Sequence, residues 1–455
     1  MSIRRSLGLV CLIASLHALF FIWYQRPDWN SQWSDQEGYR RLGQVLAATG
    51  KFTRFPDAPR FVPEVIRTPV YPLFVALIYR VFGVHQIAVA LAQVLVFVGI
   101  VLLIFAIARL ATASDRVALA AAAVTAVFPP IPYFGALVMT EVWTTLLFTA
   151  CMWLVFRARR EPSAPRYAAL GVLLALTTLS RPVFVLFPFA LAGLWFGVFP
   201  LLGRPRPRPI DGASMLAAFA VVLMPWFTYN YVTLGRFTLS PAGGVGRGLW
   251  EGSWQAAWSG RIQNELTHIG DETPDRAALD DRVRAVATRE RLPAAPMLEY
   301  VHQWQDIRRI WNDPTDPYER AISRVAADQE YQRVALINLR QQPPAQLAKR
   351  LARGLFVLWA GEIPFRYSDI NRLPPAVIYA CWAIQAALLC AAFAGLLVLA
   401  RSGRVAEACL LAAPIAYVSA VHFPLLTEAR QSLPAQPIVL LLAAIAITFR
   451  RNAGS

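Results

Sequence analysis

Two carboxylates and an arginine stand at the two ends of a polar segment between apolar runs. Asp35 and Glu37 follow the first apolar run, and Arg67 stands at the start of the next. A carboxylate beside a bilayer is partly desolvated, which tends to raise its pKa toward the range of a general base. An arginine at the same depth offers a fork of donors that suits a phosphate. These residues indicate chemistry on a lipid-linked anion.

Three further charged residues have similar placements at the ends of apolar runs: Glu141, Arg181 and Arg430. Glu141 is the candidate for a second carboxylate, facing Asp35 across a cavity. Charges at or inside a membrane boundary are functional candidates because burying them idle is costly. We therefore predict that these residues share one site with Asp35 and Arg67.

Each of these charges also has a structural interpretation. Asp35 could cap the helix that follows it. Arg67 could anchor a helix at the interface, and Glu141 could complement a helix dipole in a first turn. The sequence alone leaves these alternatives open.

The composition identifies an integral membrane protein. The 455 residues are 56% hydrophobic and 16% charged, against about a quarter charged in soluble domains. The net charge of +16 comes almost wholly from arginines, many in short gaps between apolar runs, which favours membrane orientation over nucleic-acid binding. The five cysteines lie in apolar segments without CxxC spacing, so neither a disulfide framework nor a zinc site is indicated.

About ten apolar runs approach the roughly 20 residues that a spanning helix needs. In chain order they are Leu7–Tyr24, His85–Ala108, Val117–Leu137, Val142–Phe156, Tyr167–Leu179, Val183–Leu202, Gly212–Val232, Ala376–Ala400, Ala406–Pro424 and Leu433–Phe449. Arg4 and Arg5 precede the first run, and no small-x-small cleavage site follows it. We therefore predict an uncleaved first span with a cytoplasmic N-terminus.

The run Pro69–Phe82 is too short to be an ordinary span, because 14 residues reach only about 21 Å against a core of about 30 Å. Counting it as a span would place the arginine-rich loop 204–208 outside the cell. The positive-inside rule therefore favours an amphipathic surface helix, which makes 25–84 one outer loop. Function is expected on this outer face.

The predicted fold is an all-α polytopic membrane protein in three parts: a core at 1–232, a small partly helical outer lobe at 233–375 and C-terminal membrane helices at 376–455. The lobe should end in an interfacial helix at Leu347–Trp359. The basic residues expected on the polar side of that helix are Lys349, Arg350 and Arg353.

Several motifs resemble those of the GT-C superfamily of membrane glycosyltransferases. This superfamily includes the dolichyl-phosphate-mannose protein mannosyltransferases and the lipid A aminoarabinose transferases. The motifs are Asp35-x-x-x-Tyr39, Gly50-Lys51-Phe52, Arg67-x-Pro-x-Tyr71-Pro72, Met139-Thr140-Glu141, Leu179-Ser180-Arg181-Pro182 and Pro225-Trp226…Asn230. The match covers about residues 1–235. Its specificity lies in the order and sidedness of the motifs.

The resemblance implies a GT-C-type helix core and an inverting transfer of a sugar from a polyprenyl-phosphate donor to a lipid, glycan or protein acceptor. The site would face the periplasm from the inner membrane. Asp35 would be the catalytic aspartate of the first loop, acting as a general base or positioning the acceptor, with Glu141 as the second acidic residue. The residues expected to bind the donor phosphate are Arg67, Arg181 and Arg430. Further candidates for substrate contacts are Glu37, Tyr39, Lys51 and Tyr71.

Two positions depart from the aminoarabinose transferases. Gly38 stands where those enzymes have an arginine, and Thr68 replaces a proline. Both departures argue against aminoarabinose as the donor sugar. The sequence requires no cofactor; a divalent metal has no dedicated ligand set here, although family members differ on metal use.

Two other functions fit parts of the sequence. A transporter or flippase of lipid-linked substrates would share the hydrophobicity, but it predicts internal repeats and charges near the bilayer midplane. A glycan polymerase or ligase would carry its key residues in the long outer segment, for example Arg247, His268 or His302.

Overall fold

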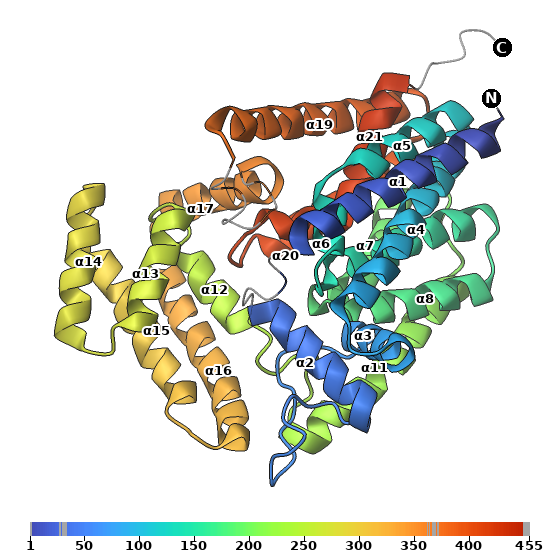
Figure 1. Ribbon diagram of the computed structural model, residues 1–455. Coiled ribbons are helices and arrows are strands. Elements are labelled where there is room, and N and C mark those ends of the chain that lie inside the picture. Colours follow the sequence, from blue (N-terminus) through green and yellow to red (C-terminus); the bar gives the residue numbers. More distant parts are fainter. Residues whose placement is uncertain are drawn as a thin grey trace.

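The computed structural model describes residues 2–26, 29, 34–361, 363, 365, 370 and 373–448, and within these residues it contains helices and loops but no β-strand. The helices form a membrane bundle and a lobe beside it (Figure 1). The predicted all-α membrane fold is thereby confirmed.

The bundle and its first outer loop hold the following elements: α1 (Ile3–Gln25), α2 (Ser34–Thr49), α3 (Val70–Phe82), α4 (Gln86–Thr112), α5 (Asp115–Val127), α6 (Pro130–Gly135), α7 (Thr140–Arg160), α8 (Ala164–Thr178), η2 (Pro182–Leu186), α9 (Phe187–Gly193), η3 (Leu194–Val198), α10 (Phe199–Leu201) and α11 (Pro209–Leu234). The lobe follows with α12 (Val245–Trp254), α13 (Gly260–Glu272), α14 (Arg276–Glu290), α15 (Ala294–Asn312), α16 (Pro317–Gln341), α17 (Pro344–Phe356) and η4 (Val357–Gly361). The chain then returns to the bundle with α19 (Pro375–Arg401), α20 (Val405–His422), η5 (Ala429–Ala435) and α21 (Gln436–Thr448).

Seven helices in the described part of the chain are long and apolar enough to cross a membrane. They are α1, α4, the continuous segment Pro182–Leu201, α11, α19, α20 and the segment Ala429–Thr448. Each coincides with a predicted span to within a few residues, except that Phe449 lies outside the described residues. The total of ten spans stays a prediction.

The three remaining predicted spans differ from the helices that the structure contains in these regions. The run 117–137 is divided because Pro129 and Pro130 separate α5 from α6. The run 142–156 lies inside α7, which carries Glu141 and three arginines at its ends. The run 167–179 lies in α8, a helix of 15 residues.

The short apolar helix α3 packs against α2 and has only 13 residues, or about 20 Å. Its length fits the predicted surface helix, whose position relative to a membrane stays a prediction. Val75 of α3 touches α2 at Gly43, where an added Cβ would lie 2.5 Å from the valine side chain.

Small residues set the closest helix contacts of the bundle. A Cβ at Gly171 of α8 would lie 2.1 Å from the carbonyl oxygen of Met215 in α11, and one at Gly395 of α19 would lie 2.0 Å from that of Leu442 in α21. Glycine at such positions lets two helix backbones approach closely, as is common in membrane bundles.

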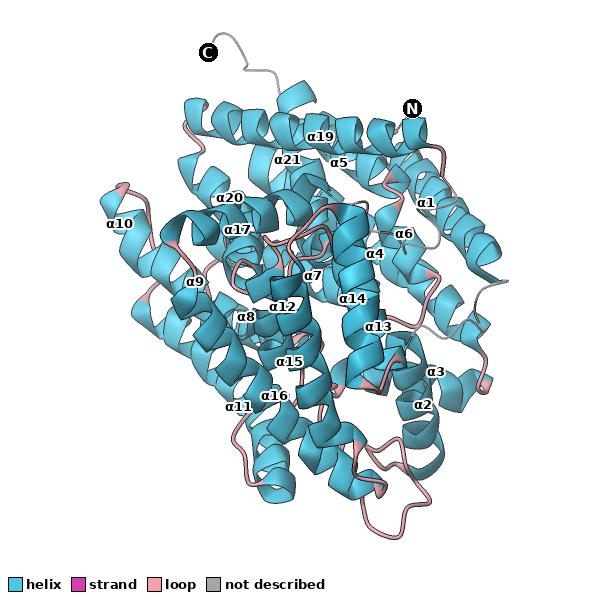
Figure 2. Cartoon of the chain, turned by 90° about the vertical axis from the view of Figure 1, so that its left-hand side faces the viewer, coloured by secondary structure: helices cyan, strands magenta, loops and turns pink. Residues whose placement is uncertain are grey.

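The lobe has a hydrophobic core of its own, built from α12 to α16 (Figure 2). Aromatic rings form its centre: Trp250 stacks on Tyr300 with ring centroids 4.7 Å apart and on Trp304 at 5.7 Å, and Tyr331 lies 5.1 Å away. No residue of this core belongs to the bundle's core among the described residues.

The predicted polar side of the helix near 347–359 is wrong at one residue. Arg350 of α17 is buried, and its Nε donates to the carbonyl oxygen of Gly252 at 2.5 Å while its Nη2 donates to that of Pro424. Carbonyl oxygens of distant segments satisfy this arginine, which an amphipathic pattern cannot show.

Candidate active site

The loop that follows α2 returns the chain so that Arg67 lies beside the first turn of this helix. Asp35 stands in that turn. Arg67 Nη2 lies 3.8 Å from Asp35 Oδ1 and donates to the Asp35 carbonyl oxygen at 3.5 Å. The Arg67 side chain is 7% exposed and that of Asp35 is 47% exposed. The carboxylate therefore faces open space while the cation is buried behind it.

Gly38 makes room for this arginine. A Cβ at this position would lie 2.1 Å from Arg67 Nη2 and 2.3 Å from its Cζ, so the guanidinium crosses the helix where a side chain is missing. The same guanidinium lies 4.8 Å from the centroid of the Tyr39 ring. The glycine that departs from the aminoarabinose transferase motif thus leaves the space that the Arg67 guanidinium occupies.

Glu141 stands in the first turn of α7 and is 1% exposed. Arg181, which directly precedes η2, donates from Nη2 to Glu141 Oε1 at 3.2 Å. The turn after α8 therefore brings a cation to a carboxylate buried between helices.

Arg430 of η5 connects the two pairs. Its Nη1 lies 3.5 Å from Asp35 Oδ2 and 3.8 Å from Glu141 Oε1, and its Nε donates to Glu428 Oε2 at 2.5 Å. The resulting ion network runs from Arg67 through Asp35, Arg430 and Glu141 to Arg181. The structure thus brings together all five residues that were predicted to share one site, from four separate segments; their roles stay predictions.

Sequence reasoning missed two acidic members of this region. Glu64 is 1% exposed, accepts the backbone N–H of Arg67 at 3.2 Å and pairs with Arg54 Nε at 2.8 Å. Glu428 holds the Arg430 guanidinium from two residues away. Glu64 lies in a loop without periodicity, so only its position three residues before Arg67 could have suggested it.

The other predicted contact residues are more dispersed. Glu37 is exposed and pairs with Arg40 at 3.2 Å. Lys51 is exposed beyond the far end of α2, about 20 Å along the helix axis from Asp35. Tyr39 packs edge-on against Tyr71, with ring centroids 5.2 Å apart, and burial raises the pKa of Tyr39 to about 12.

Buried amides fix α2 and α3 to the bundle. Gln36 Oε1 accepts the backbone N–H of Val138 at 3.0 Å. Tyr71 donates to Gln93 Oε1 at 3.2 Å, and Gln93 Nε2 donates to the carbonyl oxygen of Leu137 at 2.7 Å. The first outer loop is therefore attached to the segment just before α7, which sets the spacing between Asp35 and Glu141.

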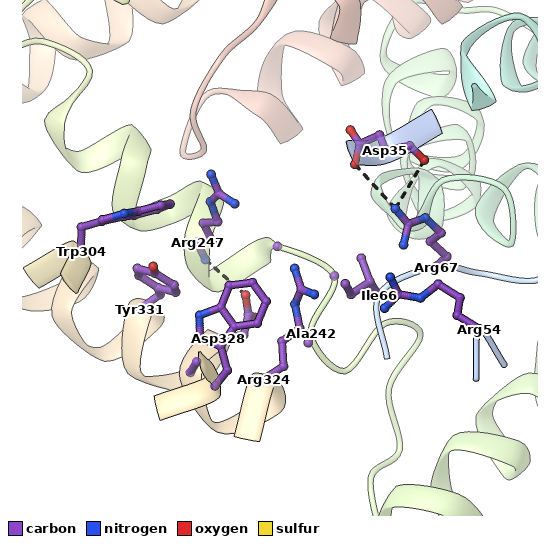
Figure 3. A pocket seen from close by; sticks show the side chains of 14 residues that line it. Asp35, Arg54, Ile66, Arg67, Ala242, Arg247, Trp304, Arg324, Asp328 and Tyr331 are labelled. Atoms are coloured by element: carbon purple, nitrogen blue, oxygen red, sulfur yellow. Dashed lines mark hydrogen bonds and ion pairs between the residues drawn. The ribbon is translucent and has the colours of Figure 1, made fainter. Parts of the chain in front are cut away.

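Residues of the ion network line one cavity, and chain neighbours of Arg430 line a second. A polar cavity of about 330 Å³ is lined by Asp35 and Arg67 and reaches the lobe (Figure 3). An apolar cavity of about 210 Å³ lies among α1, η4, α19 and η5, and its walls include Ala429 and Ser432, which flank Arg430 in the chain. Within the described residues, no group of three or more His, Cys, Asp or Glu side chains is arranged to hold a metal ion.

Comparison with known proteins agrees with this architecture. Residues 66–231 match a family model described as dolichyl-phosphate-mannose-protein mannosyltransferase. No curated protein sequence matches the chain.

Solved structures show the fold. The oligosaccharyltransferase of Archaeoglobus fulgidus in its apo form is similar with a TM-score of 0.53 at 14% identity, over 97% of this chain and 50% of that one. AglB from the same organism, in complex with an inhibitory peptide and a dolichol-phosphate, gives 0.53 at 12% identity over the same shares. ArnT from Cupriavidus metallidurans bound to undecaprenyl phosphate gives 0.43 at 15% identity, over 97% of this chain and 78% of that one.

This chain spans about half the length of the oligosaccharyltransferase structures that it matches. At these identities the likeness concerns the fold. The match to the family model, together with the shared fold of the two oligosaccharyltransferase structures, supports the predicted resemblance to the GT-C membrane glycosyltransferases.

Proposed function

We propose that this protein is an inverting glycosyltransferase that moves a sugar from a polyprenyl-phosphate donor to an acceptor at the outer face of the membrane. The observation that carries this proposal is the ion network itself. It joins a half-exposed carboxylate, Asp35, to three arginines, beside a polar cavity that Asp35 and Arg67 line and near an apolar cavity that chain neighbours of Arg430 line. This arrangement suits a reaction between a lipid-borne anion and a water-borne nucleophile.

The donor would occupy the apolar side. The isoprene units next to the phosphate would enter the apolar cavity beside η5, and the phosphate would then lie near Arg430 and Arg181, with Arg67 completing the cation set. During transfer the bond between the anomeric carbon and the phosphate oxygen breaks, and its electron pair stays on the phosphate. Preorganised cations stabilise that developing charge and lower the barrier.

The acceptor would occupy the polar side. Its hydroxyl or amine attacks the anomeric carbon from the face opposite the phosphate, and Asp35 takes the proton. The carboxylate is exposed to the polar cavity, where an acceptor can reach it. Glu141, which is buried behind Arg181 and Arg430, acts as a positioning residue for these two cations.

The comparisons support the proposal in outline. The matched family model is named for transfer from dolichyl-phosphate-mannose, and one similar structure holds a dolichol-phosphate. The comparisons do not extend to the identity of the substrates. The donor sugar would be a hexose or a pentose, and the acceptor a lipid, a glycan or a protein. The arginine-rich loops at 157–160 and 204–208 favour a cytoplasmic N-terminus and a periplasmic site.

The test is Asp35→Asn in the purified protein, reconstituted in lipid nanodiscs with a panel of radiolabelled polyprenyl-phosphate sugars and envelope extract as acceptor. We expect transfer to fall by roughly 10²- to 10⁴-fold, while donor affinity and melting temperature change little. Asp57→Asn is the matched control, because Asp57 is an exposed loop aspartate outside the site. Full transfer by Asp35→Asn would contradict the proposal.

A further inference from the structure

The polar cavity is lined by two separate parts of the chain. One wall comes from the first outer loop, with Asp35, Arg54 and Arg67, and the other comes from the lobe, with Arg247 and Arg324 (Figure 3). Four arginines therefore face one space of about 330 Å³ beside the proposed catalytic carboxylate.

Three of the four arginines have carboxylate partners. Arg54 pairs with Glu64 at 2.8 Å, and Arg67 pairs with Asp35 at 3.8 Å. Arg247 donates from Nε to an oxygen of Glu251 at 3.0 Å. A ligand at these residues would have to share a cation that already has a counter-ion.

Arg324 of α16 is different, because it forms no ion pair or hydrogen bond with any residue that the structure describes. Burial, and the nearby guanidinium groups of Arg54, Arg67 and Arg247, lower the pKa of Arg324 to about 9. An isolated, partly buried charge costs free energy unless something compensates it. Glu64 compensates this charge in part, but among the described residues no carboxylate forms an ion pair with Arg324.

The aspartate beside this arginine is already engaged. The two carboxylate oxygens of Asp328 accept the backbone N–H groups of Gly246 at 3.2 Å and Arg247 at 3.3 Å, at the start of α12. Asp328 therefore joins α16 to α12 and leaves the Arg324 guanidinium without an ion pair.

Aromatic rings hold the cations of the lobe in place. The Arg324 guanidinium lies 3.9 Å from the centroid of Trp311, and that of Arg247 lies 4.7 Å from the centroid of Trp304. A guanidinium over a ring keeps its N–H groups for other partners, and a tryptophan face also suits the apolar face of a sugar. The two tryptophans line the cavity together with Arg324.

We propose that this cavity binds an oxyanion group of the acceptor, a phosphate or carboxylate attached to a sugar, with Arg324 as its principal ligand. Binding there would hold a hydroxyl of the acceptor next to Asp35. Identifying the ligand as the acceptor rests on the proposed function. The binding of an oxyanion at Arg324 does not depend on it.

The cavity suits the acceptor better than the donor. Its walls carry four arginines and the carboxylates of Asp35 and Asp328 beside aromatic rings, a mixture that suits a charged sugar. The other cavity, next to η5, is lined mainly by apolar side chains, as a polyprenyl chain would require. Asp35, which would remove the proton of the acceptor, lines the polar cavity.

The test measures the binding of soluble probes to the full-length protein in nanodiscs, in phosphate-free buffer, by isothermal titration calorimetry. The probes are glucose 1-phosphate, glucuronate and, as the neutral counterpart, glucose. We expect the two anions to bind and glucose to bind at least tenfold more weakly. Arg324→Gln should weaken binding of the anions by about 10- to 100-fold, the loss expected for one charge-assisted contact.

The matched control is Arg333→Gln, which removes the same charge from the exposed side of the same helix, where Arg333 pairs with Glu330. It should leave probe affinity unchanged. Undecaprenyl phosphate distinguishes the two cavities: its affinity should be unaffected by Arg324→Gln and reduced by Arg430→Gln. The relative preference for glucose 1-phosphate or glucuronate identifies the class of anion.

Three results would overturn the inference: equal binding of glucose and the anions, unchanged anion affinity in Arg324→Gln, or an equal loss of undecaprenyl phosphate affinity in that variant. The first two would show that the cavity is not an anion site, and the third would assign it to the donor. None of them depends on sugar transfer, so a failure of the proposed function would be seen separately in the Asp35→Asn assay.

Discussion

The ion network at the start of α2 and the polar cavity beside it are both rich in arginine, but they differ in how the charge is compensated. In the network, Arg67, Arg181 and Arg430 each have a carboxylate within 4 Å. In the cavity, Arg324 has none among the described residues. A compensated arginine contributes to the fold as well as to any ligand, whereas an uncompensated one costs stability until a ligand arrives. Substitutions of Arg430 and of Arg324 should therefore have opposite effects on stability.

The largest effect is expected at Arg430. Arg430→Gln removes the cation that Asp35, Glu141 and Glu428 share. Glu141 is buried, but the side chains of Arg430, Asp35 and Glu428 are 26%, 47% and 36% exposed, so we expect a loss of about 2–3 kcal/mol, less than for a fully buried ion pair. We expect a strongly lowered melting temperature in nanodiscs and loss of sugar transfer. Arg430→Lys, which keeps the charge but not the fork, should recover much of the stability. An unchanged melting temperature in Arg430→Gln would show that the network does not stabilise the protein.

A smaller effect is expected from Gly38→Ala, which adds one methyl group against the Arg67 guanidinium. The contact must open by more than an ångström, so Arg67 moves away from Asp35. We expect a loss of about 1–2 kcal/mol in stability and of roughly 10- to 100-fold in transfer rate. Gly8→Ala is the control, since nothing lies within 4 Å of a Cβ there. Equal rates for the two variants would refute the steric argument.

Arg324→Gln should raise stability. The folded-state pKa of about 9 lies below the unfolded value near 12.5, so the charged form is disfavoured by folding. The cost of this charge is fully present below pH 9 and disappears as pH rises toward 12.5. Without anions at pH 7 we expect a gain of about 1 kcal/mol, or roughly 2 °C in melting temperature, and a smaller gain at pH 10. A lower melting temperature at pH 7 would mean that Arg324 has a structural role.

The smallest effect is expected at an exposed pair of the lobe. Arg333→Gln removes a surface ion pair with Glu330, and such pairs contribute about 0–1 kcal/mol. Its melting temperature should stay within about 1 °C of the parent protein at moderate salt. A large decrease would show that charge loss on α16 is itself destabilising, and the comparison with Arg324→Gln would lose its basis.

The sequence predicted the membrane bundle well because long apolar runs determine spanning helices almost alone. It also predicted that five residues would lie together, because all of them stand at the ends of apolar runs on the same side of the membrane. These residues are Asp35, Arg67, Glu141, Arg181 and Arg430. The number of spans was harder to predict from the sequence, because Pro129 and Pro130 divide one apolar run into two helices without changing its hydropathy.

The lobe was predicted only in outline. The sequence indicated a small partly helical lobe, but the significance of Arg324 depends on which groups of α2, α12 and α15 surround it. The prediction that Arg350 lies on the polar side of its helix is wrong for the same reason, because its partners are the backbone carbonyl oxygens of Gly252 and Pro424. Every residue has a backbone carbonyl oxygen, so no sequence motif could have predicted which carbonyl groups bind Arg350.

The separate hydrophobic core of the lobe has a consequence for how the molecule loses its structure. Because the cores of the lobe and the bundle share no described residue, the two regions need not unfold in one cooperative transition. Urea acts from the water phase and weakens an aqueous core more readily than helices within lipid. At intermediate urea, the population should therefore contain molecules with a melted lobe and an intact bundle. Such molecules would keep the Arg430 ion pairs with Asp35 and Glu141 while having lost the wall that carries Arg324.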